Sequence, residues 1–349
     1  MTTNRNQILI LGAAGFIGTN LTLRLLKEGK EVVAFDVPEA NMELHEKLGA
    51  KIARGTLRSL TEEGNRSTAV TPDKQSTQQK ADAAATRQTV SNQAASAKAP
   101  QPALDFTRID TVYHLISTTC PTNSNKDIVR EMEENVIDTL RLLNVLVENG
   151  VKKIVFLSSG GTVYGKEHTG VVSEEDEACP ISSYGVQKLT IEKLLYLYHE
   201  MHGLDYRIVR LSNPYGPYQK HNGVQGVVST FLWKAMHGEE INIYGDGSVI
   251  RDYIFIDDAI EGILNIASDG AGAKLYNLGS GHGVSVNEVC DAIAEVLGVA
   301  LNVTHTPARA VDVPKNVLNV ERYESEFGAA GKIALRDGIK RLKEFYENN

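Results

Sequence analysis

Short apolar segments alternate with longer amphipathic segments over most of the chain, and this alternation limits the folds open to it. The longer segments, such as 16–29, 126–149 and 184–202, carry apolar residues at helical spacing. Strands that are apolar almost throughout are typical of a parallel sheet covered by helices on both faces. The pattern therefore predicts a doubly wound α/β protein. The expected strands are residues 7–12, 31–36, 50–54, 111–117, 152–158, 206–212 and 274–280.

The same pattern suggests where the chain divides. After about residue 213 the alternation loosens into loops and short helices, which predicts a main domain over 1–213 and a smaller lobe over 214–349. Strand 274–280 is expected to return to the main sheet. Residues 58–104 have no apolar stripe of the kind a crossover helix needs, so we predict a solvated, largely disordered insertion. An Ala-rich helix over 81–99 and a partner-binding tail are the alternatives.

Composition excludes several classes of protein. The net charge of -8 and the absence of a basic face argue against a nucleic-acid partner. No apolar run approaches the ~18 residues of a membrane span, and the first residues lack a signal-peptide pattern. Cys120, Cys179 and Cys290 lie far apart, which fits a reducing compartment better than a disulfide framework or a zinc site. We expect a cytoplasmic protein without membrane insertion or a bound metal.

A glycine-rich turn follows the first expected strand. In ILILGAAGFIGTNL, Gly12, Gly15 and Gly18 let the backbone approach a pyrophosphate at a helix N-terminus. Asp36 ends the next strand about twenty residues later, where a carboxylate can accept both ribose hydroxyls and would repel a 2′-phosphate. The pair predicts NAD rather than NADP. The alternative is an ordinary tight turn, with Asp36 capping a strand end.

A tyrosine and a lysine four residues apart stand in PISSYGVQKLTIEKLL. On a helix, Tyr184 and Lys188 share one face. A free tyrosine is a poor base at neutral pH, because its pKa is about 10. A nearby ammonium and a positive nicotinamide ring should lower the pKa of Tyr184 toward the working range. An accidental pair on an exposed helix is the alternative.

The order of these motifs, with LSSGGTVYG (157–165) between them, resembles the extended short-chain dehydrogenases/reductases of the NAD-dependent epimerase/dehydratase type. The UDP-sugar 4-epimerases are the most similar group, and the resemblance covers nearly the whole chain except 58–104. It implies a Rossmann-type sheet with a smaller C-terminal substrate-binding lobe. It also implies that Tyr184 is the catalytic base, and that Lys188 binds the nicotinamide ribose and lowers the tyrosine pKa.

The serine-rich strand end departs from that family. Its members usually place Ser or Thr four residues before the tyrosine of the VYG element, where this chain has Gly160. Thr162 is the first candidate for the missing substrate-facing hydroxyl and Ser159 is the second. Ser158 either contacts the cofactor or caps the strand. The family's 4,6-dehydratases carry an Asp-Glu pair here, and SGGTVYG has no carboxylate, which argues against dehydration.

The resemblance also implies residues for binding. The implied cofactor residues beyond Gly12, Gly15, Gly18, Asp36, Ser158, Tyr184 and Lys188 are Phe16, Ile17, Leu57, Leu115 and Asn135. The implied sugar-nucleotide residues are Thr162, Asn213, Tyr244, Arg251, Arg309, Asp312 and Asn316. A dianionic diphosphate in an acidic protein requires forked guanidinium donors, which fits the two arginines. Asn316 is small enough to suggest room for an N-acetyl group at C2.

The expected activity is reversible, NAD-dependent 4-epimerisation of a UDP-hexose, either UDP-glucose/galactose or UDP-GlcNAc/GalNAc, through a 4-keto intermediate. The resemblance further implies a homodimer formed through helices 126–149 and 184–202. Three alternatives stay open: another reaction of the same family on nucleotide sugars (net redox, dehydration or decarboxylation), a catalytically impaired NAD(H)-binding sensor, and a globular protein in which the motifs are coincidental.

Overall fold

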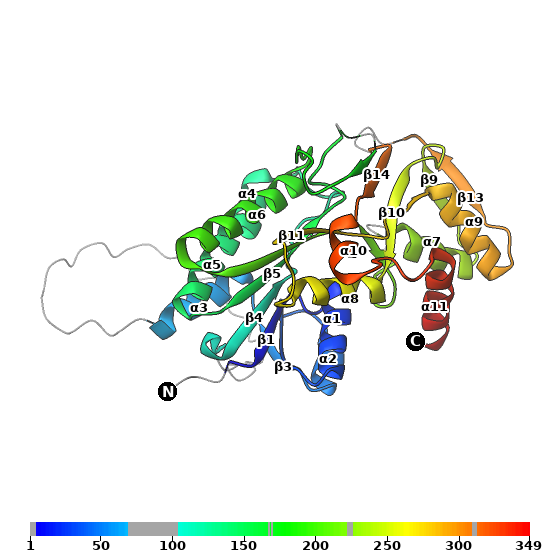
Figure 1. Cartoon of the computed structure of the whole chain (residues 1–349). Helices are drawn as coiled ribbons and strands as arrows, with labels where there is room; N and C mark the ends of the chain where they lie inside the picture. Colours follow the sequence, from blue (N-terminus) through cyan, green and yellow to red (C-terminus); the bar gives the residue numbers. More distant parts are fainter. Residues whose placement is uncertain (1–4, 69–103, 167, 169, 222–225, 309–312) are drawn as a thin grey trace, which may run out of the picture.

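A seven-stranded sheet forms the centre of the molecule in this computed structural model, which describes residues 5–68, 104–166, 168, 170–221, 226–308 and 313–349 (Figure 1). The strand order is β11-β7-β5-β4-β1-β2-β3, and all neighbouring strands run parallel. The predicted doubly wound α/β fold is confirmed. The strands are β1 (Gln7–Leu11), β2 (Glu31–Asp36), β3 (Lys51–Arg54), β4 (Ile109–His114), β5 (Lys153–Ser159), β7 (Asp205–Leu211) and β11 (Leu275–Leu278).

Alternating side chains of each strand supply two separate cores. On β1, Ile10 joins the core beneath α1 (Phe16–Lys27) and α8 (Ile256–Ala267). Leu9 and Leu11 join the core beneath α5 (Asp138–Glu148) and α6 (Ser183–His202). Figure 1 shows α3, α5 and α6 on one side of the sheet and α1, α2 (Glu43–Lys47) and α8 on the other. Burial on both faces explains why these strands are apolar throughout.

The prediction for residues 58–104 is wrong at its start. Helix α3 (Leu57–Thr68) packs beside α5, and Leu57 and Leu60 are buried in the same core. The apolar stripe covers little more than one turn, which is too short a pattern to recognise in a polar segment. Residues 69–103, including the Ala-rich stretch, lie outside the described residues.

Smaller sheets begin where the main sheet ends. One has the order β12-β10-β14-β6 with β8 paired to β10, and β13 pairs with β9 in another. Strand β8 starts two residues after β7, so this part of the chain grows directly from the carboxyl edge of the main sheet. Its strands are β6 (Val171–Val172), β8 (Asn213–Tyr215), β9 (Ile241–Tyr244), β10 (Ile250–Phe255), β12 (Gly283–Ser285), β13 (Val303–Thr306) and β14 (Lys315–Leu318).

The remaining helices flank these sheets or continue α5. They are α4 (Ile128–Met132), the π-helical turn η2 (Glu133–Ile137), α7 (Val227–Met236), α9 (Val286–Leu297), α10 (Glu321–Phe327) and α11 (Leu335–Asn348). A short 3-10 turn, η1 (Phe106–Arg108), leads into β4. None of the helices in the described part of the chain combines the length and apolar character needed to cross a membrane.

Candidate active site

The glycine turn lies at the switch point of the sheet, where the chain leaves edge strand β3 and re-enters beside β1 as β4. Gly12 has φ +86°, and a Cβ on Gly18 would stand 2.1 Å from the Gly12 carbonyl oxygen. Gly15 caps α1 without a side-chain hydrogen bond, and the first turn carries no acidic residue. The helix therefore presents its N–H groups to an anion, which fits the pyrophosphate of NAD.

Asp36 is held beside this turn. Its Oδ2 accepts from the Ala14 N–H at 2.8 Å and its Oδ1 from the Val37 N–H at 2.8 Å. Each carboxylate oxygen keeps further acceptor capacity, as recognition of ribose hydroxyls requires. His45 on α2 lies 2.9 Å from the Ala13 carbonyl oxygen and is buried, so it braces the turn from behind. Sequence reasoning missed His45.

The other predicted cofactor residues lie on several different elements. Phe16 and Ile17 are half-buried at the start of α1, and Leu115 follows β4, where its N–H donates to the Leu11 carbonyl oxygen. Leu57, the first residue of α3, is buried in the core beneath α5 and α6. Asn135 lies in η2, where its Nδ2 donates to Thr118 Oγ1 at 2.8 Å and its Oδ1 accepts from the Thr118 N–H at 2.9 Å. It thereby fixes the loop after β4.

Tyr184 and Lys188 lie beside the carboxyl end of β5. The Ser182 side chain caps α6 by accepting from the Gly185 N–H, so Tyr184 lies in its first turn. Lys188 Nζ lies 5.5 Å from the centre of the Tyr184 ring and donates to the Leu157 carbonyl oxygen at 2.8 Å. The Ser159 side chain lies beside the Tyr184 hydroxyl and acts to lower its pKa. A phenol, a hydroxyl and an ammonium thus converge at the carboxyl edge of the sheet.

The protein's own groups raise the pKa of Tyr184 rather than lower it, and the predicted effect of the nicotinamide ring stays a prediction. Desolvation of the hydroxyl raises the Tyr184 pKa to about 12, and the Ser159 side chain opposes this only in part. Burial also lowers the pKa of Lys188 to about 8, while Glu192 acts in the opposite direction. Spacing along a helix showed that the two groups are neighbours, but it could not show how deeply both are buried.

The three hydroxyls of the serine-rich stretch have different surroundings. Ser159 contacts Tyr184, as described. Ser158 is buried, and its hydroxyl donates to the carboxylate of Glu192 on α6. Thr162, the first candidate from sequence, has a buried Oγ1 without a hydrogen-bond partner among the described residues. Ser159, rather than Thr162, therefore lies beside the Tyr184 hydroxyl.

Gly160 has a steric explanation. A Cβ at this position would stand 2.6 Å from Leu318 Cδ1 and 3.1 Å from the Arg210 carbonyl oxygen. A serine would therefore collide with β14 and the backbone of β7. Asn316 on β14 reinforces this contact, because its Nδ2 donates to the Gly160 carbonyl oxygen at 3.2 Å. Asn316 is only 4% exposed, and its Oδ1 has no partner among the described residues.

The predicted sugar-nucleotide residues are less enclosed. Asn213 on β8 donates through Nδ2 to the Asp252 carbonyl oxygen at 2.9 Å. Arg251 on β10 donates through Nη1 to the carbonyl oxygens of Ile250 and Val313, at 2.8 and 2.6 Å. Tyr244, at the end of β9, is 46% exposed. Arg309 and Asp312 lie outside the described residues.

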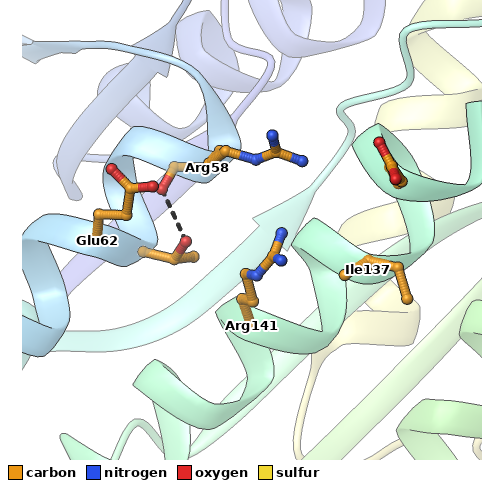
Figure 2. A pocket seen from close by; sticks show the side chains of 6 residues that line it. Arg58, Glu62, Ile137 and Arg141 are labelled. Carbon is orange, nitrogen blue, oxygen red and sulfur yellow. Dashed lines mark hydrogen bonds between the residues drawn. The ribbon is translucent and has the colours of Figure 1, made fainter. Parts of the chain in front are cut away.

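A separate cavity of about 530 Å³ lies between α3 and the η2–α5 segment (Figure 2). Arg58 and Arg141 both pair with the buried carboxylate of Asp138, so their charges are already compensated. None of the lining residues is a candidate cofactor or substrate residue. They are Arg58, Thr61, Glu62, Glu133, Ile137 and Arg141.

Comparison with known proteins shows the family of this chain. The model of the NAD dependent epimerase/dehydratase family matches residues 8–279. The crystal structure of UDP-glucose 4-epimerase from Thermotoga maritima, solved with UDP-glucose, is similar with a TM-score of 0.82 and 27% identity, over 98% of this chain and 99% of that one.

Two further relatives are informative. UDP-glucose 4-epimerase from Thermus thermophilus, solved with NAD, has a TM-score of 0.79 and 26% identity, over 98% of this chain and 99% of that one. A dTDP-4-dehydro-6-deoxyglucose reductase of Escherichia coli is 30% identical, over 98% of each chain. The resemblance inferred from the motifs is confirmed, and so is NAD as the cofactor.

Proposed function

We propose that this chain, which belongs to the NAD dependent epimerase/dehydratase family, interconverts a UDP-hexose and its C4 epimer. The convergence of Tyr184, Ser159 and Lys188 beyond the glycine turn carries the proposal. The likeness to an epimerase solved with UDP-glucose supports this choice of substrate class.

The chain's own residues supply the proton transfer. NAD⁺, when bound, would supply the hydride acceptor at C4. The phenolate of Tyr184 takes the proton of the C4 hydroxyl, becomes a phenol, and gives the proton back at the end of the reaction. The ammonium of Lys188 stabilises the phenolate, and Ser159 lies beside the Tyr184 oxygen. Asp36 and the N-terminus of α1 hold the dinucleotide in place.

The sugar end would hold the nucleotide firmly and the hexose loosely. We assign the diphosphate to Arg251 with Arg309, the uridine ribose to Asp312, the uracil to Tyr244 and the sugar side to Asn213 and Thr162. Few polar contacts to the hexose would let the 4-keto sugar turn about its diphosphate link. Asn316 is small, but its amide is tied to Gly160, so the space beside it is set by the backbone as well as by side-chain size.

Replacing the phenol is the direct test. Tyr184→Phe should lower kcat for conversion of UDP-glucose to UDP-galactose about 10³-fold, because it removes only the transferable proton. Product NMR without added NAD measures turnover, and circular dichroism checks the fold. Tyr346→Phe on α11 is the matched control, because the Tyr346 hydroxyl has no hydrogen-bond partner among the described residues, and it should behave like the wild type. Comparable turnover in both variants would remove Tyr184 from this role.

A net redox reaction is the second candidate, because a reductase is among the relatives at 30% identity. Epimerisation leaves the NAD pool unchanged, whereas reduction or oxidation of a sugar consumes or releases NADH in proportion to product. Absorbance at the NADH band during turnover separates the two. The chain has no carboxylate in SGGTVYG, which argues against dehydration here.

We also propose that the protein is a homodimer. Exposed apolar side chains gather on α4, η2 and α6, the helices that the resemblance places at a subunit interface. They are Ile128, Val129, Ile137, Val186, Tyr196, Leu197 and Met201. Val129→Asp should shift the mass measured by light scattering toward the monomer. Val299→Asp, on an exposed apolar residue elsewhere, is the control, and an unchanged mass in both would argue against this interface.

A further inference from the structure

A buried carboxylate lies behind the catalytic pair. Tyr184, Lys188 and Glu192 follow one another at intervals of four residues on α6, so they share one face of the helix. Glu192 is 4% exposed, and a buried charge is costly unless it is paired and hydrogen-bonded. Its Oε1 accepts from Ser158 Oγ at 2.5 Å and from Arg210 Nε at 3.1 Å, and its Oε2 accepts from Arg210 Nη2 at 2.7 Å.

These contacts tie the helix to two strands. Ser158 and Arg210 are cross-strand partners on β5 and β7. The Arg210 guanidinium also lies 4.9 Å from the centre of the Tyr164 ring, and the Tyr164 hydroxyl donates to Asn277 Oδ1 on β11 at 2.6 Å. Ser158 is followed directly by Ser159, the residue whose side chain lies beside the Tyr184 hydroxyl. The position of the catalytic strand end thus depends on the carboxylate.

The charges facing Lys188 give Glu192 a second role. Tyr184 and Glu192 face Lys188 from α6, His114 from β4, and Arg210 lies behind Glu192 on β7. His114 is neutral at physiological pH, because burial lowers its pKa to about 3. Burial disfavours the Lys188 ammonium, and the interaction with Glu192 favours it. The carboxylate therefore helps the buried lysine to keep its proton.

We propose that Glu192 is a positioning residue for the reaction, which keeps the Lys188 ammonium charged and holds the Ser158–Ser159 strand end against Tyr184. The inference rests on the proposed roles of Tyr184 and Lys188. Glu192 does not contact the substrate or the cofactor in this proposal. It acts through Lys188 and Ser159.

The test is the pH dependence of Glu192→Gln. Loss of one nearby opposite charge should move the alkaline limb of kcat down by about one pH unit, so that kcat at pH 8 falls about fivefold while KM changes less than about twofold. Glu192→Asp keeps the charge and should restore most of the profile. Asp258→Asn, which removes another buried carboxylate far along the chain, should lower stability but leave the profile unchanged.

A measurement that needs no turnover separates this inference from the proposed function. In NAD-bound protein labelled with ¹³Cε-lysine, the Lys188 signal, identified by its loss in Lys188→Met, should titrate at lower pH in Glu192→Gln than in the wild type. If the titration and the alkaline limb both stay in place, the inference is wrong even in an active epimerase. If the wild type epimerises nothing, the NMR titration alone decides it.

The single variant leaves Arg210 buried without its partner, which could prevent folding. Glu192→Gln combined with Arg210→Gln removes both charges and takes its place in that event. The Lys188 titration should again move to lower pH, because the ammonium of Lys188 is affected by Glu192 and not by Arg210. An unchanged titration in the double variant would also overturn the inference.

Discussion

The two ends of the candidate site are built differently. At the cofactor end, Asp36, Asn135 and Lys188 each have hydrogen-bond partners within the chain. At the sugar end, Tyr244 is 46% exposed, and Arg251 donates to the main-chain carbonyl oxygens of Ile250 and Val313. The first arrangement is preorganised for a ligand that stays bound. The second suits a substrate whose sugar has to leave one orientation and take another.

The strongest test of this contrast is a substitution at Gly18, where the cofactor end leaves no room for a side chain. Gly18→Ala would place a methyl group against the Gly12 backbone, which cannot yield as a flexible side chain could. We expect NAD binding about 100-fold weaker, equivalent to about 3 kcal/mol. Cofactor released on denaturation, and affinity by calorimetry, measure the effect. Gly270→Ala has room for its methyl group and should retain NAD; equal retention in both would show that this end is not preorganised.

Arg251→Met probes the sugar end. Loss of charge-assisted hydrogen bonds should raise KM for the UDP-sugar about 10-fold or more with little change in kcat, because the diphosphate is bound similarly throughout the reaction. Steady-state kinetics give both constants. Arg341→Met, an exposed arginine paired with Asp257, is the control. A fall in kcat at unchanged KM would mean that Arg251 serves the chemistry, and the contrast between the two ends would fail.

Gly160 lies where the two ends meet. Gly160→Ala should lower the free energy of unfolding by about 1–3 kcal/mol, because its Cβ overlaps Leu318 and the Arg210 carbonyl oxygen. Urea unfolding measures the loss, and Leu318→Val in the same chain should recover part of it. Gly170→Ala meets nothing within 4 Å and is the control. A stable Gly160→Ala protein would show that the two ends are less closely packed than described.

The smallest expected effect concerns His114 beneath the cofactor end. Its pKa is about 3 in the fold and near 6.5 when unfolded, so the unfolded chain binds more protons between these values and stability falls as pH drops below 6.5. Relative to His114→Asn, the wild type should lose about 1.4 kcal/mol between pH 7.5 and pH 5.5. Urea unfolding at both pH values gives the difference. Parallel curves would mean that His114 is not enclosed.

The parts of the molecule that sequence could predict are those with a local signature. The strand periodicity gave the main sheet, and glycine spacing with Asp36 gave the dinucleotide turn. The rest depends on contacts between distant segments. Gly160 is explained by Leu318, more than 150 residues away, and the choice of Ser159 over Thr162 depends on which side of the strand end faces α6.

Glu192 and the burial of Tyr184 illustrate two different limits. Glu192 had a signal, because it continues the four-residue spacing of Tyr184 and Lys188, but its partner Arg210 lies on another strand. The raised pKa of Tyr184 had none, since desolvation depends on everything packed around a side chain. Helix α3 was missed because its buried apolar residues Leu57 and Leu60 stand in an otherwise polar stretch of sequence.

The return of β11 to the edge of the main sheet has a consequence for how this protein can vary. The chain leaves the sheet after β7, builds β8, β9 and β10, and comes back to pair with β7 before leaving again. A cut at residue 213 would therefore strip an outer strand from the dinucleotide half. The predicted sugar-binding lobe is therefore not a continuous segment that could be exchanged by itself, and under the proposed function new substrates would be gained by changing side chains in place.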